Sequence, residues 1–375
     1  MTAVQKKFYD PFDHYIRKLP VPDPEIQRKR VKINQGSVLG VTNLTHDTLK
    51  LVVKCDASSQ PLGGIAGQYA AIKVPGVRKP RSYSFARAPE DENPGEHTFF
   101  IRLVPGGELS GWLAKGSCIG EPVEISGPLG NFQLDPSSDT MVCIAGGSGM
   151  SAIVAIVEHA ANLGVARDCY FFYGARTQKD LYCREEIQAV QNKWNQGYRF
   201  EFIPVLSEEP ESSDWEGPRG FVTEHFQAEY LAPGKLHLDE VKAYFCGPPP
   251  MIDHGVKLLM DAGLDDKNIY FDKFEDASSP APVVDNTKCV LCDECLLVKP
   301  VPNCLVEATN FRTDGDDSSF YFERVRPAYT SGLYYNSLYI DEDECIRCFA
   351  CVDACPHDAI SVAYDKTPKT LRMYK

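Results

Sequence analysis

Several features that mark common classes of protein are missing from this sequence. Its 375 residues contain no apolar run long enough to cross a bilayer, and residues 1–30 have no apolar core of a secretory signal. We therefore expect no membrane span and a cytoplasmic location. Basic residues are also in deficit, since 39 Lys and Arg face 52 Asp and Glu, for a formal net charge of −13. This balance argues against nucleic acid or an anionic membrane surface as the main partner, and it more often indicates solubility, with a basic protein partner as the alternative.

The motifs of hydrolytic catalysis are absent too. The eight histidines form no H-E-x-x-H pair, and no nucleophile elbow is present. Hydrophobic residues make up 43% of the chain and charged residues 24%, which is typical of a folded globular protein. The length predicts two or three domains.

The pattern of apolar residues changes along the chain. Short alternating runs broken by turns predict an antiparallel barrel or sandwich, and the later alternation of apolar strands with helices predicts a doubly wound α/β domain. A segment rich in Pro, Ser and Ala (EDASSPAPVVDN) predicts a linker before a cysteine-rich module. The expected parts are an N-terminal extension (1–30), a barrel (31–135), an α/β domain (136–275), a linker (276–286) and a cysteine-rich α+β domain (287–375).

Eight of the 14 cysteines fall in two tight groups after residue 288. Each group is a C-x2-C-x2-C triplet with a fourth cysteine further on, eight residues later in the first group and three residues later, before Pro356, in the second. Such a loop can offer three thiolates to an iron–sulphur cluster, whereas four-cysteine zinc sites usually pair two C-x2-4-C knuckles. The eight candidate metal ligands are Cys289, Cys292, Cys295, Cys304, Cys345, Cys348, Cys351 and Cys355.

These spacings resemble the ferredoxins that bind two [4Fe–4S] clusters, over about residues 287–365. In that family the fourth cysteine of each motif binds the other cluster. The resemblance thus implies that Cys355 joins the first triplet and that Cys304 joins the second. The eight-residue gap before Cys304 departs from the family pattern and leaves open a changed potential or the loss of one iron. The stretch at about 305–344 predicts a hairpin insertion.

Two short motifs in the predicted barrel suit a phosphate and a planar ring. Arg81-Ser82-Tyr83-Ser84 offers a charged fork, an aromatic face and hydroxyl donors. The turn Gly106-Gly107 lets backbone N–H groups approach a pyrophosphate, with Ser110 in the helix that follows. Each motif is weak alone.

Two further motifs connect an apolar strand to a helix in the α/β domain. Gly146-Gly147-Ser148-Gly149 has the context that a nucleotide pyrophosphate loop requires, although such a turn can also be only a tight connection. Cys246-Gly247-Pro248 and Met251 occupy a similar place later in the chain.

In this order the motifs resemble the ferredoxin–NADP reductase family. Within that family they are most similar to the motifs of the reductase components of multicomponent oxygenases. The matching segments are RSYS, PGGELSGWL, GPLGNF, IAGGSGMSAI, FYGARTQKDLY, VLSEE, GPRGFVTEHF, CGPPPM and the terminal strand IYFDKFED. The resemblance implies a six-stranded flavin barrel and a nucleotide domain. It also implies that Arg81 holds the flavin phosphate, that Tyr83 covers the ring and that Ser84 lies at the N5 edge.

The same resemblance implies the remaining roles. Gly107 and Ser110 would lie at the pyrophosphate, which favours FAD over FMN. The turn 146–149 would line the nicotinamide nucleotide site, with Cys246 beside the nicotinamide ring. Glu275, in the terminal strand, would either close over the flavin or begin the linker.

The choice of nicotinamide depends on the residues facing the ribose. An acidic residue suits the free hydroxyls of NADH, and basic residues suit the extra phosphate of NADPH. Glu208 stands where NADP-type relatives tend to carry a basic residue and favours NADH, whereas Arg176 and Lys179, beside Asp180, favour NADPH.

The leading hypothesis is a reductase component that passes electrons from NADH through FAD and two [4Fe–4S] clusters to a separate terminal oxygenase. The family's oxygenase reductases generally carry a plant-type [2Fe–2S] module, so the two-cluster module is a departure. The alternatives are an NAD(P)H:ferredoxin-type oxidoreductase that serves a reductive enzyme and a wiring subunit of a larger redox complex. The sequence does not indicate an oligomeric state.

Overall fold

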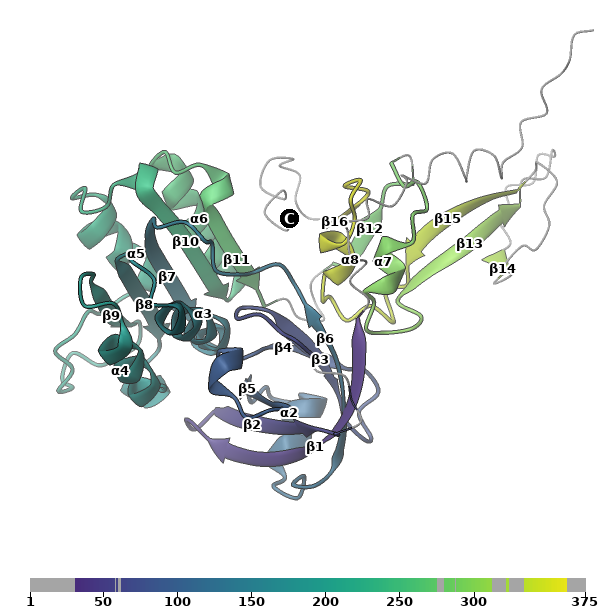
Figure 1. The fold of residues 1–375 in the computed structure, drawn as a ribbon, viewed down its shortest axis with the longest axis horizontal. Helices are drawn as coiled ribbons and strands as arrows, with labels where there is room; N and C mark the ends of the chain where they lie inside the picture. Colours follow the sequence, from purple (N-terminus) through teal and green to yellow (C-terminus); the bar gives the residue numbers. More distant parts are fainter. Residues whose placement is uncertain are drawn as a thin grey trace, which may run out of the picture. The chain divides into compact units, whose positions relative to one another are not determined.

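The computed structural model describes residues 31–57, 59, 62–274, 280–286, 288–311, 322–323 and 334–362, with only the backbone for 307–311, 322–323 and 334–337. The predicted N-terminal extension and Glu275 lie outside the described residues. The chain divides into an N-terminal unit, within residues 32–278, and a C-terminal unit, within residues 279–366 (Figure 1). Among the described residues, no helix is both long and apolar enough to span a membrane.

The first half of the N-terminal unit is an antiparallel barrel, one of the two arrangements that its alternating sequence allows. Its strands pair in the order β4-β3-β6-β1-β2-β5, and an isolated bridge between Phe85 and Phe99 links the two edges, so the barrel is nearly closed. Its elements are β1 (Lys32–Asn43), β2 (Thr48–Cys55), β3 (Tyr69–Lys73), β4 (Arg81–Ser84), β5 (Glu96–Arg102), β6 (Pro122–Leu129) and the helix α2 (Glu108–Ala114).

Alternation explains the inside of this barrel. In β2, Leu49, Leu51 and Val53 are buried, and each lies two residues from the next because successive side chains of a strand point to opposite faces. Ile101 and Ile125, from β5 and β6, join the same core. The six-stranded barrel implied by the family resemblance is confirmed.

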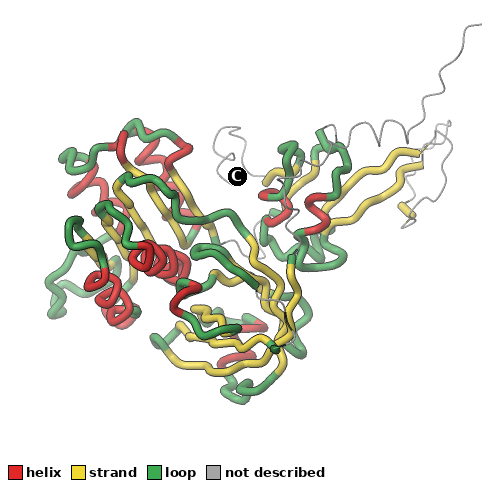
Figure 2. The backbone as a smooth tube through the Cα atoms, viewed as in Figure 1, coloured by secondary structure: helices red, strands yellow, loops and turns green. Residues whose placement is uncertain are grey.

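The second half of the unit is a parallel sheet with helices on both faces, as predicted (Figure 2). The sheet has the order β11-β10-β7-β8-β9. The chain starts at β7 in the middle, moves to one side through β8 and β9, and then returns to the other side with β10 and β11. A ligand crevice is expected where the order reverses, beyond the carboxyl ends of β7 and β10.

The two faces of the sheet have separate hydrophobic cores. On one face pack α3 and α4, through residues such as Ile153 and Ile187. On the other pack α5 and α6, through residues such as Phe226 and Leu259. The elements are β7 (Thr140–Gly146), α3 (Met150–Leu163), β8 (Cys169–Ala175), α4 (Arg184–Lys193), β9 (Phe200–Leu206), α5 (Val222–Phe226), β10 (Val241–Gly247), α6 (Pro249–Asp261) and β11 (Ile269–Lys273).

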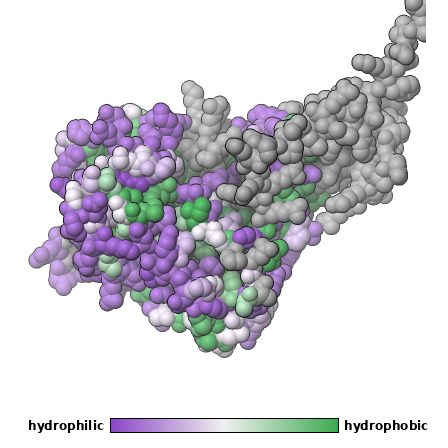
Figure 3. All heavy atoms as spheres, in the orientation of Figure 1, coloured by the Kyte–Doolittle hydropathy of each residue, from purple (hydrophilic) through white to green (hydrophobic). Residues whose placement is uncertain are grey.

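Short helical turns connect these elements. They are η1 (Pro89–Asp91), η2 (Gly147–Gly149), η3 (Gln178–Asp180), η4 (Gln227–Leu231), η5 (Leu238–Glu240) and η6 (Asp266–Asn268). The visible surface over the α/β domain is mostly hydrophilic, with small hydrophobic areas between the polar residues (Figure 3). The buried apolar residues of this domain form the two cores on the faces of its sheet.

The C-terminal unit consists of short elements around the cysteines. Its elements are β12 (Pro282–Val284), α7 (Glu294–Leu297), β13 (Leu305–Phe311), β14 (Phe322–Glu323), β15 (Tyr334–Ile340), α8 (Ala350–Asp353) and β16 (Ile360–Val362). Strands β13 and β15 pair antiparallel, and β14 pairs with β13, in the region where a hairpin insertion was predicted. The small core joins Cys295, Leu305, Leu338 and Ile360.

The predicted linker needs a correction. Residues 282–284, in the second half of the predicted linker 276–286, form β12, which pairs antiparallel with β16 near the end of the described chain. The backbone groups of this proline-rich stretch find partners in β16, so tertiary pairing overrides the local composition. The ordered C-terminal unit thus begins inside the predicted linker.

Candidate cofactor and cluster sites

The two motifs predicted for the flavin lie together at one side of the barrel. The Arg81 guanidinium donates to the backbone oxygens of Lys79 and Pro80, at 3.0 and 3.1 Å, and pairs with Glu108 at 3.1 Å. Glu108 is the first residue of α2, directly after the Gly106-Gly107 turn. The strand β4 and the glycine turn are 20 residues or more apart in the sequence, and this ion pair joins them.

The Gly106-Gly107 turn requires both glycines. Gly106 has a φ of +73°, and a side chain on Gly107 would place its Cβ 2.5 Å from the Ser110 hydroxyl. Ser110 is buried, and its hydroxyl accepts a hydrogen bond from the Val104 amide at 3.3 Å. The hydroxyl therefore closes the turn from within, and a contact of Ser110 with the pyrophosphate stays a prediction.

The rest of β4 fits a bound ring system. The Ser82 hydroxyl is buried and has no hydrogen-bond partner among the described residues, so it is free to bind a ligand. Burial raises the pKa of the Tyr83 phenol, more than the nearby Arg81 charge lowers it. Tyr83 is therefore a neutral aromatic surface at every physiological pH.

A residue that the sequence analysis did not single out, Asp272, connects the two halves of the N-terminal unit. The Ser84 hydroxyl donates to the Asp272 carboxylate at 3.2 Å, and the Cys246 sulphur lies 4.0 Å from the same oxygen. Ser84 ends β4 of the barrel, whereas Cys246 and Asp272 are register partners on the neighbouring strands β10 and β11. The residue predicted at flavin N5 and the residue predicted beside the nicotinamide thus meet at one carboxyl group.

Removal from solvent makes this carboxyl group an unusually weak acid. Desolvation raises the pKa of Asp272 to about 7, against a smaller lowering effect of the Ser84 hydrogen bond, although part of the residue surface stays exposed. Burial, and then the Asp272 charge, raise the pKa of the Cys246 thiol, which is therefore neutral. The sequence signal for Asp272 is an acidic residue inside the apolar terminal strand.

The glycine turn after β7 packs against the turn after β10, at the point where the strand order reverses. A Cβ on Gly149 would lie 2.0 Å from the Cys246 backbone oxygen, and one on Gly146 would lie 2.6 Å from the Met251 sulphur and 3.0 Å from Pro248. Only glycine allows this approach. The predicted nucleotide residues of both motifs therefore pack against one another where the strand order reverses.

The ribose-side segments after β8 and β9 are joined by hydrogen bonds. The Glu208 amide donates to the Arg176 oxygen at 2.8 Å, and the Gln178 amide donates to the Glu209 carboxylate, also at 2.8 Å. Asp180 holds this segment from inside, because its carboxylate accepts from the Thr177 amide and hydroxyl at 2.9 and 3.0 Å. The predicted residues Arg176, Asp180 and Glu208 thus belong to one ordered surface.

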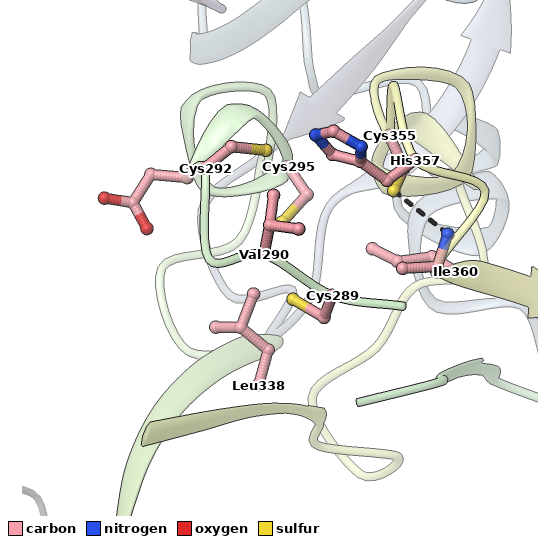
Figure 4. A pocket seen from close by; sticks show the side chains of 10 residues that line it. Cys289, Val290, Cys292, Cys295, Leu338, Cys355, His357 and Ile360 are labelled. Atoms are coloured by element: carbon pink, nitrogen blue, oxygen red, sulfur yellow. Dashed lines mark hydrogen bonds between the residues drawn. The ribbon is translucent and has the colours of Figure 1, made fainter. Parts of the chain in front are cut away.

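The cysteines of the C-terminal unit gather in two sets. One pocket is lined by Cys289, Cys292, Cys295 and Cys355, and in Figure 4 these side chains surround it from two separate loops. Electrostatic interactions join Cys304 with Cys345 and Cys348, and they join Cys351 with the same three and also with Cys295. The fourth cysteine of each motif therefore lies with the triplet of the other motif.

Both triplets have the same strained backbone. Leu291 and Asp293 in the first triplet, and Arg347 and Phe349 in the second, have φ values of +55° to +63°. This left-handed conformation is costly for residues other than glycine and is concentrated at functional sites. It turns backbone N–H groups toward the sulphurs, as in the Arg347 amide, which donates to the Cys345 sulphur at 3.4 Å.

These sets fit iron–sulphur clusters chemically. Burial and the neighbouring thiols raise the pKa of Cys295 to about 12, and of Cys304, mainly through burial and Cys345, to about 11. These raised pKa values favour the protonated thiols. Bound iron would reverse this preference, because it stabilises the thiolate. In the first pocket the His357 ring nitrogen Nε2 is also buried and has no partner among the described residues, so it is a free polar group beside the four sulphurs.

Comparison with protein families matches the three parts of the chain. Residues 35–134 match the oxidoreductase FAD-binding domain, 143–257 the oxidoreductase NAD-binding domain, and 338–361 the 4Fe-4S binding domain. The last match contains the second cysteine motif. The predicted resemblance to the reductase family and to a ferredoxin module is confirmed at this level.

Individual relatives agree with these matches. The electron transfer component of xylene/toluene monooxygenase from Pseudomonas putida is 41% identical over 231 residues, which are 62% of this chain and 62% of that protein. The reductase component of phenol 2-monooxygenase from Pseudomonas sp. strain CF600 is 31% identical over 69% of this chain and 70% of its own length. The solved ferredoxin reductase in carbazole 1,9a-dioxygenase has 30% identity and a TM-score of 0.57, over 65% of this chain and 70% of that chain. The chain therefore belongs to the family of FAD- and NAD-binding oxidoreductases that includes the reductase components of oxygenases.

Proposed function

We propose that this chain is an NADH-dependent reductase that passes electrons through FAD and two [4Fe–4S] clusters to a separate terminal oxygenase. The observation that carries the proposal is the meeting of Ser84, Cys246 and Asp272. It brings a flavin-side strand of the barrel and a nicotinamide-side strand of the α/β sheet to one carboxyl group. This proximity supports the proposal, because hydride transfer requires the two bound rings to lie next to each other.

Bound FAD supplies the chemistry that joins a two-electron donor to one-electron clusters, and the chain positions it. Arg81 would hold a flavin phosphate, and the neutral Tyr83 would cover the ring. The Ser82 hydroxyl supplies a further free hydrogen-bonding group, and Ser84 would lie at the N5 edge. Asp272 would orient the Ser84 hydroxyl and hold a proton on its carboxylate at pH values below about 7.

The nicotinamide nucleotide would lie across the crevice beyond β7 and β10. The turn 146–149 would approach its phosphates, and Cys246, Gly247, Pro248 and Met251 would bound the nicotinamide end. Glu208 and the pairing of Arg176 with two carboxylates support NADH over NADPH. Asp180, also proposed as a nucleotide residue, would act by holding the ribose-side segment in shape.

Two clusters are proposed from the crossed sets of cysteines. Cys289, Cys292, Cys295 and Cys355 would hold one cluster, and Cys304, Cys345, Cys348 and Cys351 the other. The pocket that joins Cys355 with the first triplet supports this division, as do the matching left-handed residues of the two loops.

The acceptor is proposed from the relatives. Their names describe electron-transfer components of xylene/toluene monooxygenase and of toluate and anthranilate dioxygenases. The matched region covers 62% to 67% of those proteins. An oxygenase partner and a cytoplasmic location for this chain therefore remain proposals.

Reduction of an artificial acceptor by the isolated chain tests the activity. We expect NADH to drive fast, FAD-dependent reduction of ferricyanide, with a lower kcat/KM for NADPH. Strong turnover would exclude a wiring subunit that works only within a complex. Absence of NADH-driven flavin reduction in FAD-loaded protein would contradict the proposal.

A further inference from the structure

The turn between β1 and β2 of the barrel reaches the ribose-side segment of the α/β domain. Asp47, in this turn, lies 2.6 Å from the Arg176 guanidinium, which also contacts Asp180 at 2.6 Å. The Asp47 carboxylate further lies 3.5 Å from Arg102. Two carboxylates and two guanidinium groups thus form a balanced patch, in which Asp47 is the bridge between the two domains of the N-terminal unit.

This patch is a closed ion-pair network and not a metal site. His46, Asp47 and Asp180 lie close enough together to bind a cation. However, the Arg176 guanidinium already contacts both carboxylates at hydrogen-bond distance and supplies the positive charge. Desolvation raises the pKa of Asp47, but hydrogen bonds from Thr45 and the Arg176 charge outweigh it, so the carboxyl group stays ionised.

Arg176 stands where it could read the nucleotide. It follows β8 directly, at the sheet edge where the glycine turn after β7 also lies, and its backbone oxygen holds the Glu208 segment. Its side chain keeps 40% of its surface exposed. An arginine in this part of a dinucleotide-binding fold suits the 2′-phosphate of NADPH. An Arg176 without its carboxylate partners would therefore favour NADPH over the proposed coenzyme, NADH.

We propose that Asp47, contributed by the flavin-binding barrel, is a specificity-determining residue that makes the reductase select NADH by occupying Arg176. The inference rests on the proposed nucleotide site. Asp180 offers Arg176 only one carboxylate oxygen, because its second oxygen accepts from the Thr177 amide and hydroxyl. Replacing Asp47 by a neutral residue leaves two arginines facing one aspartate, so the patch gains one net positive charge and can accept a phosphate.

The test measures nucleotide binding and does not depend on turnover. In the full chain, Asp47→Asn should raise the affinity for adenosine 2′,5′-bisphosphate about tenfold and change that for 5′-AMP less than about twofold, by isothermal titration calorimetry. The NADPH to NADH ratio of kcat/KM should rise by a similar factor. Adding Arg176→Gln should remove the gain, and the control Glu121→Gln, an exposed carboxylate elsewhere on the barrel, should show none.

The outcomes separate this inference from the proposed function. If 5′-AMP binds but Asp47→Asn brings no gain for the bisphosphate, or if the gain persists without Arg176, the inference is wrong and the nucleotide site stands. If neither probe binds the wild-type chain, the nucleotide site is wrong and the inference falls with it. Asp47→Ser serves as a second variant, and the circular dichroism spectrum of each variant verifies its fold.

Discussion

The N-terminal unit assembles its candidate site residues from distant segments, and the C-terminal unit assembles its candidate cluster ligands from local loops. Ser84 and Asp272 are 188 residues apart in the sequence and meet because a barrel and a sheet pack against each other. Cys289, Cys292 and Cys295 lie within one short loop, and only their fourth partner, Cys355, comes from elsewhere.

The two units also differ in what holds them together. The N-terminal unit has a barrel core and two sheet cores of fully buried side chains. Among the described residues of the C-terminal unit, the hydrophobic cluster around the cysteines contains four buried residues, one of which is Cys295. A core of this size stabilises a fold weakly, so metal binding is expected to contribute much of the folding free energy there. Loss of the cofactors should therefore lower the stability of the C-terminal unit more than that of the N-terminal unit.

The largest effect is expected from Cys355→Ser. Because Cys355 lies with the first triplet, the variant should lose the cluster of that triplet and about half of its iron. Its EPR spectrum after reduction should match that of Cys289→Ser and differ from that of Cys345→Ser. Cys118→Ser, a buried cysteine of the barrel, is the control and should keep all its iron. A spectrum that matches Cys345→Ser would rule out the crossed arrangement.

The second effect tests the long-range assembly in the N-terminal unit. Asp272→Ala leaves the Ser84 hydroxyl without its acceptor, and flavin reduction by NADH should slow at least about tenfold in stopped-flow measurements. Desolvation raises the pKa of Asp272 to about 7, so the carboxyl group loses its proton as the pH rises through that value. We expect the resulting negative charge near the proposed N5 edge to oppose the build-up of negative charge on the flavin. The wild-type rate should therefore fall as the pH rises through about 7.

Asp272→Asn keeps a neutral hydrogen-bonding group at all pH values. It should retain the rate at pH 6 and lose the pH dependence. The control Asp261→Asn, on the exposed part of α6, should behave as the wild type. An unchanged pH profile in Asp272→Asn would show that another group titrates.

A smaller effect concerns the stability of the barrel. Burial lowers the pKa of His97, but its hydrogen bonds with Cys55 and Glu92 outweigh this and raise it to about 9. A raised histidine pKa stabilises the fold fully below the unfolded value of about 6.5, and the contribution is lost as the pH rises through 9. The free energy of unfolding should therefore fall by up to about 3 kcal/mol over that window.

Urea unfolding followed by tryptophan fluorescence measures this effect in the right unit, because Trp112, Trp194 and Trp215 all belong to the N-terminal unit. His97→Gln should flatten the pH dependence between pH 6.5 and 9. The exposed His237→Gln should leave it unchanged. An equal slope in His97→Gln and the wild type would contradict the assignment.

The smallest effect concerns the first cluster pocket. His357 Nε2 is a free donor or acceptor beside the four sulphurs, and an N–H donor stabilises the reduced, more negative cluster. His357→Leu should lower the reduction potential of that cluster on the order of tens of millivolts in an EPR-monitored redox titration. His357→Gln keeps an N–H group and should shift it less. Equal shifts in both variants would mean that the ring acts through its volume.

The same contrast explains how much the sequence could predict. Cysteine spacing indicated the candidate cluster loops directly, since three of the proposed ligands sit in one loop. The order of motifs indicated the barrel and the doubly wound sheet. Asp272 could not be found by spacing, because its partners become visible only from the pairing of β10 with β11 and the approach of β4. Asp47 was missed because its partner Arg176 lies in the other domain and is far away in the sequence. The segment that forms β12 was interpreted as a linker from its composition, which its pairing with β16 overrides.

Anaerobic titration of the FAD- and cluster-loaded chain with NADH, followed by EPR and an iron count, tests the central claim most directly. The account predicts about eight irons per chain and the appearance of signals from two reduced clusters as NADH is added. Bleaching of the flavin without any cluster signal, or an iron content clearly below eight, would contradict it.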